Sequence, residues 1–141
     1  MSTEVIVYVL TALAAVVIVL TRLRLAGGEG AAGQVQIGGG LLLAHTVVGA
    51  LALLAWLVYL VFPSDSVLGG DVVGILAIGL WWVVALVGLL ILARWLPSKG
   101  RHATAAAEDT WSEGPGLSVL AHVGMAVGVL VFTFAYLTSA V

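Results

Sequence analysis

Four long apolar runs, separated by short polar segments, are the feature that most limits how this chain can fold. They cover residues 5–21, 41–62, 72–94 and 117–138. A helix of about 20 apolar residues crosses the hydrocarbon core of a bilayer and pairs its own backbone polar groups there. Of the 141 residues, 62 % are hydrophobic and 9 % are charged, a balance that a soluble domain of this length could not bury. The sequence therefore predicts an all-α integral membrane four-helix bundle, in one domain over residues 1–141.

The basic residues gather at two of the three connections between these runs. The first and third connections hold all of them: Arg22, Arg24, Arg94, Lys99 and Arg101. The opposite side carries only acidic groups: Glu4, Asp65 and Asp71. By the positive-inside rule the basic connections are cytoplasmic. This predicts an up-down-up-down bundle with both termini outside. The Ala-, Val-, Leu- and Gly-rich composition favours a prokaryotic inner (plasma) membrane.

Several catalytic and transport chemistries lack their usual residues. The chain has no cysteine, which excludes disulfides, iron–sulfur clusters and thiolate zinc sites. Apart from Arg94 at the end of the third run, no charged residue lies inside a run, so a proton relay or ion pump lacks its intramembrane groups. No Ser-His-Asp set or paired carboxylate site is present either. We therefore expect an electron-transfer or accessory subunit rather than a stand-alone enzyme. Its expected partners are lipid and other membrane subunits or a second copy, and not nucleic acid.

An internal echo links the second and fourth runs. The sequence Leu-Ala-His ends at His45 and again at His122, and Tyr59 and Tyr136 each follow fourteen residues later. Fourteen residues is close to four helical turns, so each histidine shares a helix face with its tyrosine. Because the two helices are parallel, the imidazoles should lie at similar depth near the cytoplasmic side. The echo predicts a matched histidine pair.

The predicted bundle leaves space between these histidines. Helices 2 and 4 would be diagonal, with axes about 11 to 14 Å apart when neighbours are about 8 to 10 Å apart. Gly49 and Ala126 stand one turn beyond the histidines, and their small side chains leave room for something flat. This separation is too wide for a direct histidine–histidine hydrogen bond and suits two imidazoles on opposite faces of one planar cofactor.

These residues resemble the b-type cytochromes of membranes, in which a four-helix bundle holds haem between histidines on two helices. The resemblance is one of pattern, and it implies one haem b with His45 and His122 as axial metal ligands and no open position for oxygen. Gly49 would lie beside the cofactor. Arg22 and Arg94, at the cytoplasmic helix ends, would neutralise its propionates. The expected function is membrane electron transfer, with quinone as a further candidate cofactor.

Other uses of the same residues stay open. Intramembrane histidines often form hydrogen bonds between helices, and they can contact a quinone or a metal. Arg22 and Arg94 can equally fix topology or reach lipid headgroups. The chain would then be a cofactor-free accessory or assembly subunit of a respiratory membrane complex. Gly124 and Gly128 form a small-residue step that suits close packing against another helix, and His102 in the polar loop is expected to be solvated.

Overall fold

The computed structural model describes residues 2–26, 39–95 and 116–141, and throughout these segments the regular structure is helical. The helices are α1 (Thr3–Ala26), α2 (Gly39–Val61), α3 (Asp71–Trp95) and α4 (Gly116–Leu137). Each contains a segment long and apolar enough to cross a membrane. The predicted all-α chain with four membrane-length helices is therefore confirmed. α1 continues beyond the predicted end at residue 21, because Arg22 and Arg24 favour a helix as well as most apolar residues do.

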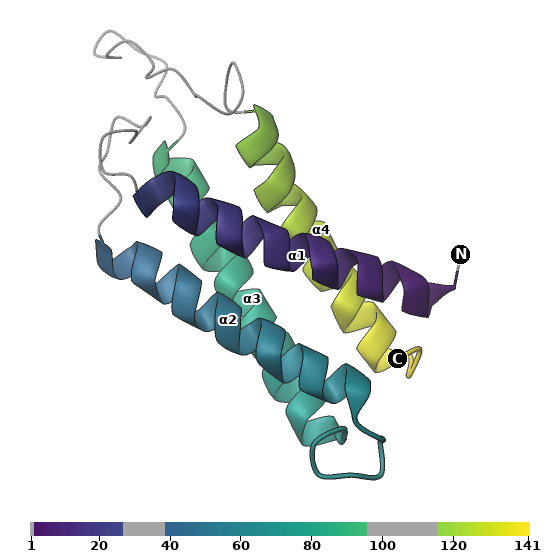
Figure 1. Ribbon diagram of the computed structural model, residues 1–141. Coiled ribbons are helices and arrows are strands. Elements are labelled where there is room, and N and C mark those ends of the chain that lie inside the picture. The colour runs from purple at the N-terminus through teal and green to yellow at the C-terminus, as the bar shows by residue number, and fades with distance from the viewer. Residues whose placement is uncertain (1, 27–38, 96–115) are drawn as a thin grey trace, which may run out of the picture.

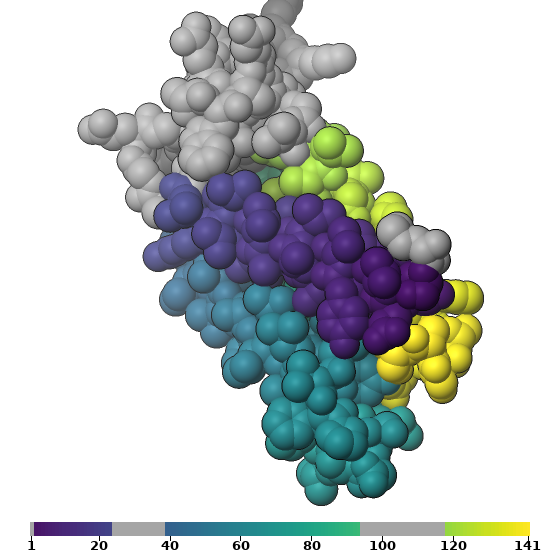
Figure 2. Space-filling view, turned by 45° about the vertical axis from the view of Figure 1, so that its right-hand side comes forward, coloured from purple at the N-terminus to yellow at the C-terminus, as the bar shows by residue number. Residues whose placement is uncertain are grey.

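Each helix packs against two others (Figure 1). The contacting pairs are α1 with α2, α2 with α3, α3 with α4, and α1 with α4. The contact between α2 and α3 is the most extensive. Figure 2 shows α1 lying across the molecule, with α2 on one side and α4 on the other. α2 and α4 therefore lie diagonally across the bundle, and residues on their inner faces can meet only through side chains.

Aromatic rings fill the centre of the bundle. The side chains of Trp56, Trp81 and Phe132 are fully buried. The Phe132 ring centre lies 5.0 Å from that of Trp56 and 5.5 Å from that of Trp81, distances at which aromatic pairs attract each other. These rings come from α2, α3 and α4, so they join three helices in one cluster.

Two hydrogen bonds between side chains also connect helices. The Trp56 indole N–H donates to the Thr11 hydroxyl at 3.1 Å, which joins α2 to α1. The Trp82 indole N–H donates to the Thr133 hydroxyl at 3.2 Å, which joins α3 to α4. A polar group in an apolar environment is costly unless it is paired, so these bonds favour one relative rotation of the helices.

The small-residue step on α4 makes no close contact with another described helix. A Cβ added at Gly124 or Gly128 would meet no atom within 4 Å outside the backbone of its own helix. No part of the described chain therefore uses this step for close packing. The predicted contact with a further helix or subunit stays a prediction.

Candidate functional site

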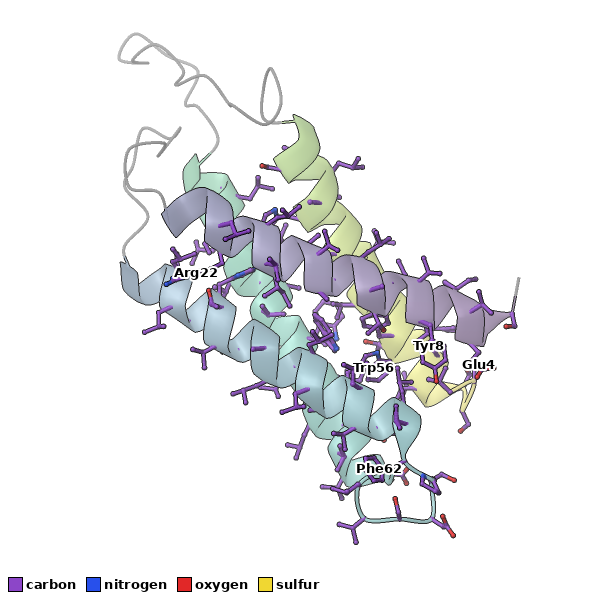
Figure 3. All side chains as sticks on the ribbon, in the orientation of Figure 1. Glu4, Tyr8, Arg22, Trp56 and Phe62 are labelled. Atoms are coloured by element: carbon purple, nitrogen blue, oxygen red, sulfur yellow. The ribbon has the colours of Figure 1, made fainter. Side chains whose placement is uncertain are left out.

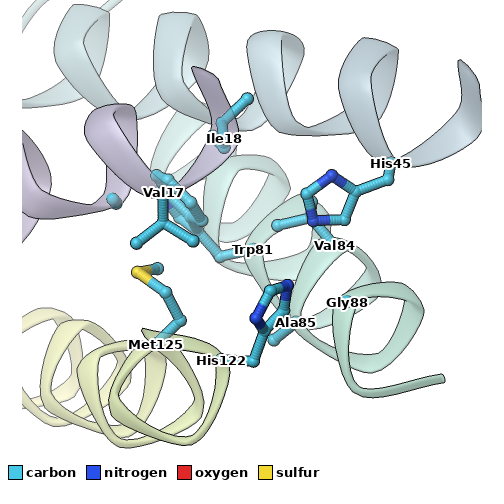
Figure 4. A pocket seen from close by; sticks show the side chains of 10 residues that line it. Val17, Ile18, His45, Trp81, Val84, Ala85, Gly88, His122 and Met125 are labelled. Atoms are coloured by element: carbon cyan, nitrogen blue, oxygen red, sulfur yellow. The ribbon is translucent and has the colours of Figure 1, made fainter. Parts of the chain in front are cut away.

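His45 and His122 lie close together in the interior of the bundle. The centres of their rings are 6.3 Å apart, and the ring planes are inclined at 41°. His45 is 3 % exposed, and His122 is half-buried. Figure 4 shows the two imidazoles turned toward each other, from α2 and α4. The histidines that the sequence echo paired are thus brought together by the fold.

Equal position along two helices explains why the rings meet. Each histidine comes six residues after the start of its helix. At the other end of the same helices, the Tyr59 and Tyr136 ring centres lie 5.6 Å apart. α2 and α4 therefore run in the same direction with matched registers, and both halves of the echo correspond to neighbouring ring pairs.

The backbone of α4 fixes the protonation of His122. Its Nδ1 lies 2.9 Å from the Ser118 carbonyl oxygen, one turn earlier. A carbonyl oxygen can only accept, so Nδ1 carries the proton and donates it. In the neutral ring Nε2 then holds the lone pair. Metal-binding histidines commonly show this arrangement, in which a backbone carbonyl orients the ring and selects its tautomer.

α3 forms the wall beside the histidine pair at Gly88. A Cβ added there would lie 3.0 Å from His122 Cδ2 and 3.3 Å from His45 Nε2. Both distances are shorter than an ordinary carbon contact, so only glycine lets α3 approach both rings. Gly88 was not among the residues predicted for the site. Its run holds two further glycines, Gly74 and Gly79, so the sequence pattern does not distinguish it from them.

A small cavity of about 20 Å³ adjoins the two rings. Two of its polar nitrogens, His45 Nδ1 and Trp81 Nε1, are buried and form no hydrogen bond within the described part of the chain. The lining residues include no carboxylate and no base other than the histidines: Ala14, Val17, Ile18, His45, Trp81, Val84, Ala85, Gly88, His122 and Met125. The site is therefore apolar apart from the imidazole and indole nitrogens.

The ring separation suits a metal held by both histidines. A metal–nitrogen bond is about 2.0 Å long, and a ring centre lies about 1.1 Å behind its nitrogen, so two imidazoles on opposite sides of one ion have centres about 6.2 Å apart. The observed 6.3 Å agrees with this value. Two histidines cannot complete a tetrahedral site. Among the described residues, no group of three or more His, Cys, Asp or Glu gathers around a point.

The available space does not suit a haem. A cavity of about 20 Å³ holds about one water molecule, and a macrocycle is many times larger. A Cβ added at Gly88 of α3 would lie 3.0 Å from His122 and 3.3 Å from His45, so α3 lies close to the space that a macrocycle between the rings would need. The histidines are suitable ligands for a haem iron. The surrounding helices, as arranged here, leave no room for the haem macrocycle. Haem b stays a prediction that would require α3 to move away from the histidine pair.

The other predicted site residues lie at different distances from the pair. A Cβ on Gly49 would contact Ile18 and Val84 at 3.1 to 3.3 Å, so Gly49 packs behind two cavity-lining residues. Arg22 is exposed, one turn beyond Ile18 on α1. Figure 3 shows it far from Glu4 along α1. The Arg94 side chain and all of His102 lie outside the described residues. The proposed roles of these four residues are untested.

No protein-family model matches this sequence, and no curated protein or solved structure shows a significant similarity to it. The function therefore has to be inferred from the residues of the site and their geometry.

Proposed function

We propose that this chain is a membrane electron-transfer protein with a redox metal between His45 and His122. The observation that carries the proposal is the 6.3 Å separation of the two imidazole rings, which Figure 4 shows turned toward each other. Imidazole binds iron, copper and zinc ions, and a redox-active ion there would supply one-electron exchange. The two histidines would hold the ion, and the Ser118 carbonyl would keep the His122 ring oriented.

The surroundings of the pair favour electron transfer over substrate chemistry. The cavity offers no carboxylate, lysine or arginine to bind a substrate or to act as an acid or base. The cavity-lining side chains Val84 and Ile18 are apolar and buried. A site whose metal only gains or loses one electron needs no substrate pocket. The small cavity is consistent with this function.

Haem b is one candidate for the redox metal centre, but the bundle would have to open to accommodate it. Binding would require α3 to withdraw at Gly88, and the cavity-lining side chains of α1 would have to turn aside. In such an opened bundle, Arg22 and Arg94 would neutralise the propionates. The haem content of the purified protein tests this form directly.

We further propose the membrane topology that the charges predict. The up-down-up-down chain would keep both termini outside a prokaryotic inner membrane, with the histidine pair near the cytoplasmic face. The contacts along the helices support alternation: Ile18 lies near Gly49, and Thr11 bonds to Trp56. α1 and α2 therefore run in opposite directions.

A quinone would need a different place from the histidine cavity. A larger cavity of about 160 Å³ lies at the tyrosine end of the bundle, lined by Glu4, Tyr8, Tyr59, Leu60, Phe62, Ser64, Gly69 and Val141. It combines hydroxyl groups with apolar walls, as ligand pockets do. Figure 3 shows Glu4, Tyr8 and Phe62 near this end. We propose this cavity as the candidate quinone site.

The test of the function is a measurement of metal and of reversible redox change. The protein would be purified in detergent after expression with both haem precursor and copper available. We expect a bound redox metal or haem that is lost in the double variant His45→Ala, His122→Ala and kept in His102→Ala. If neither metal nor haem is found and no redox step appears in voltammetry, the electron-transfer proposal is wrong.

A second candidate is a cofactor-free accessory subunit of a membrane complex. The observation in its favour is the close approach of α3 to both imidazoles, which fills the space that a large cofactor would need. In that case the histidines act as packing and hydrogen-bonding groups. The same purification distinguishes it, because the wild-type protein would then be colourless and metal-free while remaining folded.

A further inference from the structure

We propose that the histidine pair binds a single copper(I) ion and that Met125 is its third ligand. This inference rests on the proposed function in requiring a redox metal at the pair, and it names the metal and one further residue. It follows from two observations. The ligand set suits a metal, and the cavity is too small for a haem. Three features of the site indicate which ion it binds: the volume of the cavity, the lack of a carboxylate in its lining, and the soft sulfur of Met125.

The size of the cavity matches one ion. Its volume is about 20 Å³, enough for one water-sized particle. The ring centres are separated as they would be if one ion bridged two nitrogens nearly in line. Gly88 allows α3 to approach the rings and to enclose the space beside them. A bare ion can occupy this position without displacing a helix.

The charge balance favours a monovalent ion. No carboxylate lines the cavity, so nothing there neutralises a buried metal cation. Burying an uncompensated charge away from water is costly, and the cost rises steeply with charge. Zinc also requires four ligands in a structural site, and the described chain offers no third His, Cys, Asp or Glu nearby. Copper(I) has one charge and accepts fewer ligands, so the apolar site would favour the reduced form of a redox-active copper over copper(II).

Met125 supplies the soft atom. It lines the same cavity as the histidines and follows His122 by three residues, which places it on the same helix face. Figure 4 shows its sulfur in the space between α1 and α4, next to Val17 and turned away from the two rings. A thioether selects copper(I) over harder ions, and the three rotatable bonds of methionine let the sulfur turn toward the ring nitrogens.

The experiment is an anaerobic titration of the full chain with copper(I). The purified protein would compete with a coloured copper(I) chelator, and the bound metal would be examined by X-ray absorption. We expect one copper per chain, with two nitrogen ligands and one sulfur ligand. Met125→Leu keeps the size of the side chain, so the helix content should not change. It should lose the sulfur signal and weaken copper binding by about tenfold or more.

Matched variants make the result decisive. His45→Ala should abolish binding, and His102→Ala should leave both the affinity and the spectrum unchanged. A protein that binds one haem instead of copper, with Met125→Leu without effect, overturns this inference and leaves the proposed function intact. A folded protein that binds neither overturns both. Copper bound with no sulfur signal, or zinc bound as tightly as copper(I), also overturns the inference.

Discussion

At the scale of single residues, the space around the histidine pair depends on a glycine of α3. Gly88 lies close to both rings, since an added Cβ would meet atoms of each. The pair itself is oriented from α4 by the Ser118 carbonyl. The position of the rings is therefore set by α3 as well as by the two helices that bear the histidines.

The substitution Gly88→Ala tests this dependence. The added methyl would lie 3.0 Å from His122 Cδ2 and 3.3 Å from His45 Nε2, so one or both rings would have to shift by tenths of an ångström. We expect the affinity for the bound metal to fall by about tenfold or more, as with other groups that orient ligands. The measurement is metal content and affinity of the purified variants.

Gly79→Ala is the matched control on the same helix. An added Cβ at Gly79 would meet nothing within 4 Å, so this variant should bind metal as the wild type does. Equal affinities for the two variants would show that Gly88 does not limit the space at the pair.

At the scale of the helices, polar bonds inside an apolar bundle fix how the helices face one another. The Thr11 hydroxyl donates to the Val7 carbonyl at 2.8 Å and accepts from the Trp56 indole at 3.1 Å. Thr11 is 4 % exposed and Trp56 is fully buried. This bond therefore joins α1 to α2 where water is absent.

Thr11→Val should weaken the bundle. Valine keeps the shape of the side chain and removes the acceptor, so the buried indole N–H is left without its partner. Bonds of this kind between membrane helices contribute about 0.6 kcal/mol on average, and up to about 1.7 kcal/mol. We expect the free energy of unfolding to fall by about this amount in a denaturing-detergent titration.

Thr46→Val serves as the comparison for this helix contact. The Thr46 hydroxyl donates only to the Leu42 carbonyl of its own helix, among the hydrogen bonds of the described residues. Its removal should therefore change the free energy of unfolding by less than Thr11→Val does. The reverse order would argue against a stabilising role for the bond between α1 and α2.

At the scale of the whole molecule, the distribution of charge along the helices supports the membrane orientation proposed above. Glu4 lies in the first turn of α1 and Asp65 in the turn between α2 and α3, whereas Arg22 and Arg94 lie near the C-terminal ends of α1 and α3. Figure 1 shows the two chain ends close to each other. Both termini would then share one side of the membrane.

Cysteine labelling tests that orientation. The chain has no native cysteine, so a cysteine introduced at Ser64 or at Ser98 is the only reactive thiol. Ser64 is exposed in the turn between α2 and α3. We expect an impermeant maleimide to label Ser64→Cys from outside intact cells and to label Ser98→Cys only after the cells are opened. Labelling of both from the same side would contradict the four-span topology.

The sequence by itself determined the elements. Helix positions agreed with the apolar runs to within a few residues, except at the end of α1, because membrane crossing depends on local hydrophobicity and length. It also paired His45 with His122, because equal depth in two parallel helices follows from counting residues along each run.

The tertiary structure decided what surrounds the pair. These helices are apolar on nearly every side, so their periodicity gives little indication of which face points inward. Gly88, Trp81 and Met125 could therefore not be selected as site residues from the pattern. The size of the cavity could not be predicted from the pattern either, because it depends on how closely α3 approaches two other helices. That distance is set by packing among residues far apart in the sequence, and it is the reason a site predicted for a haem has room for a single ion.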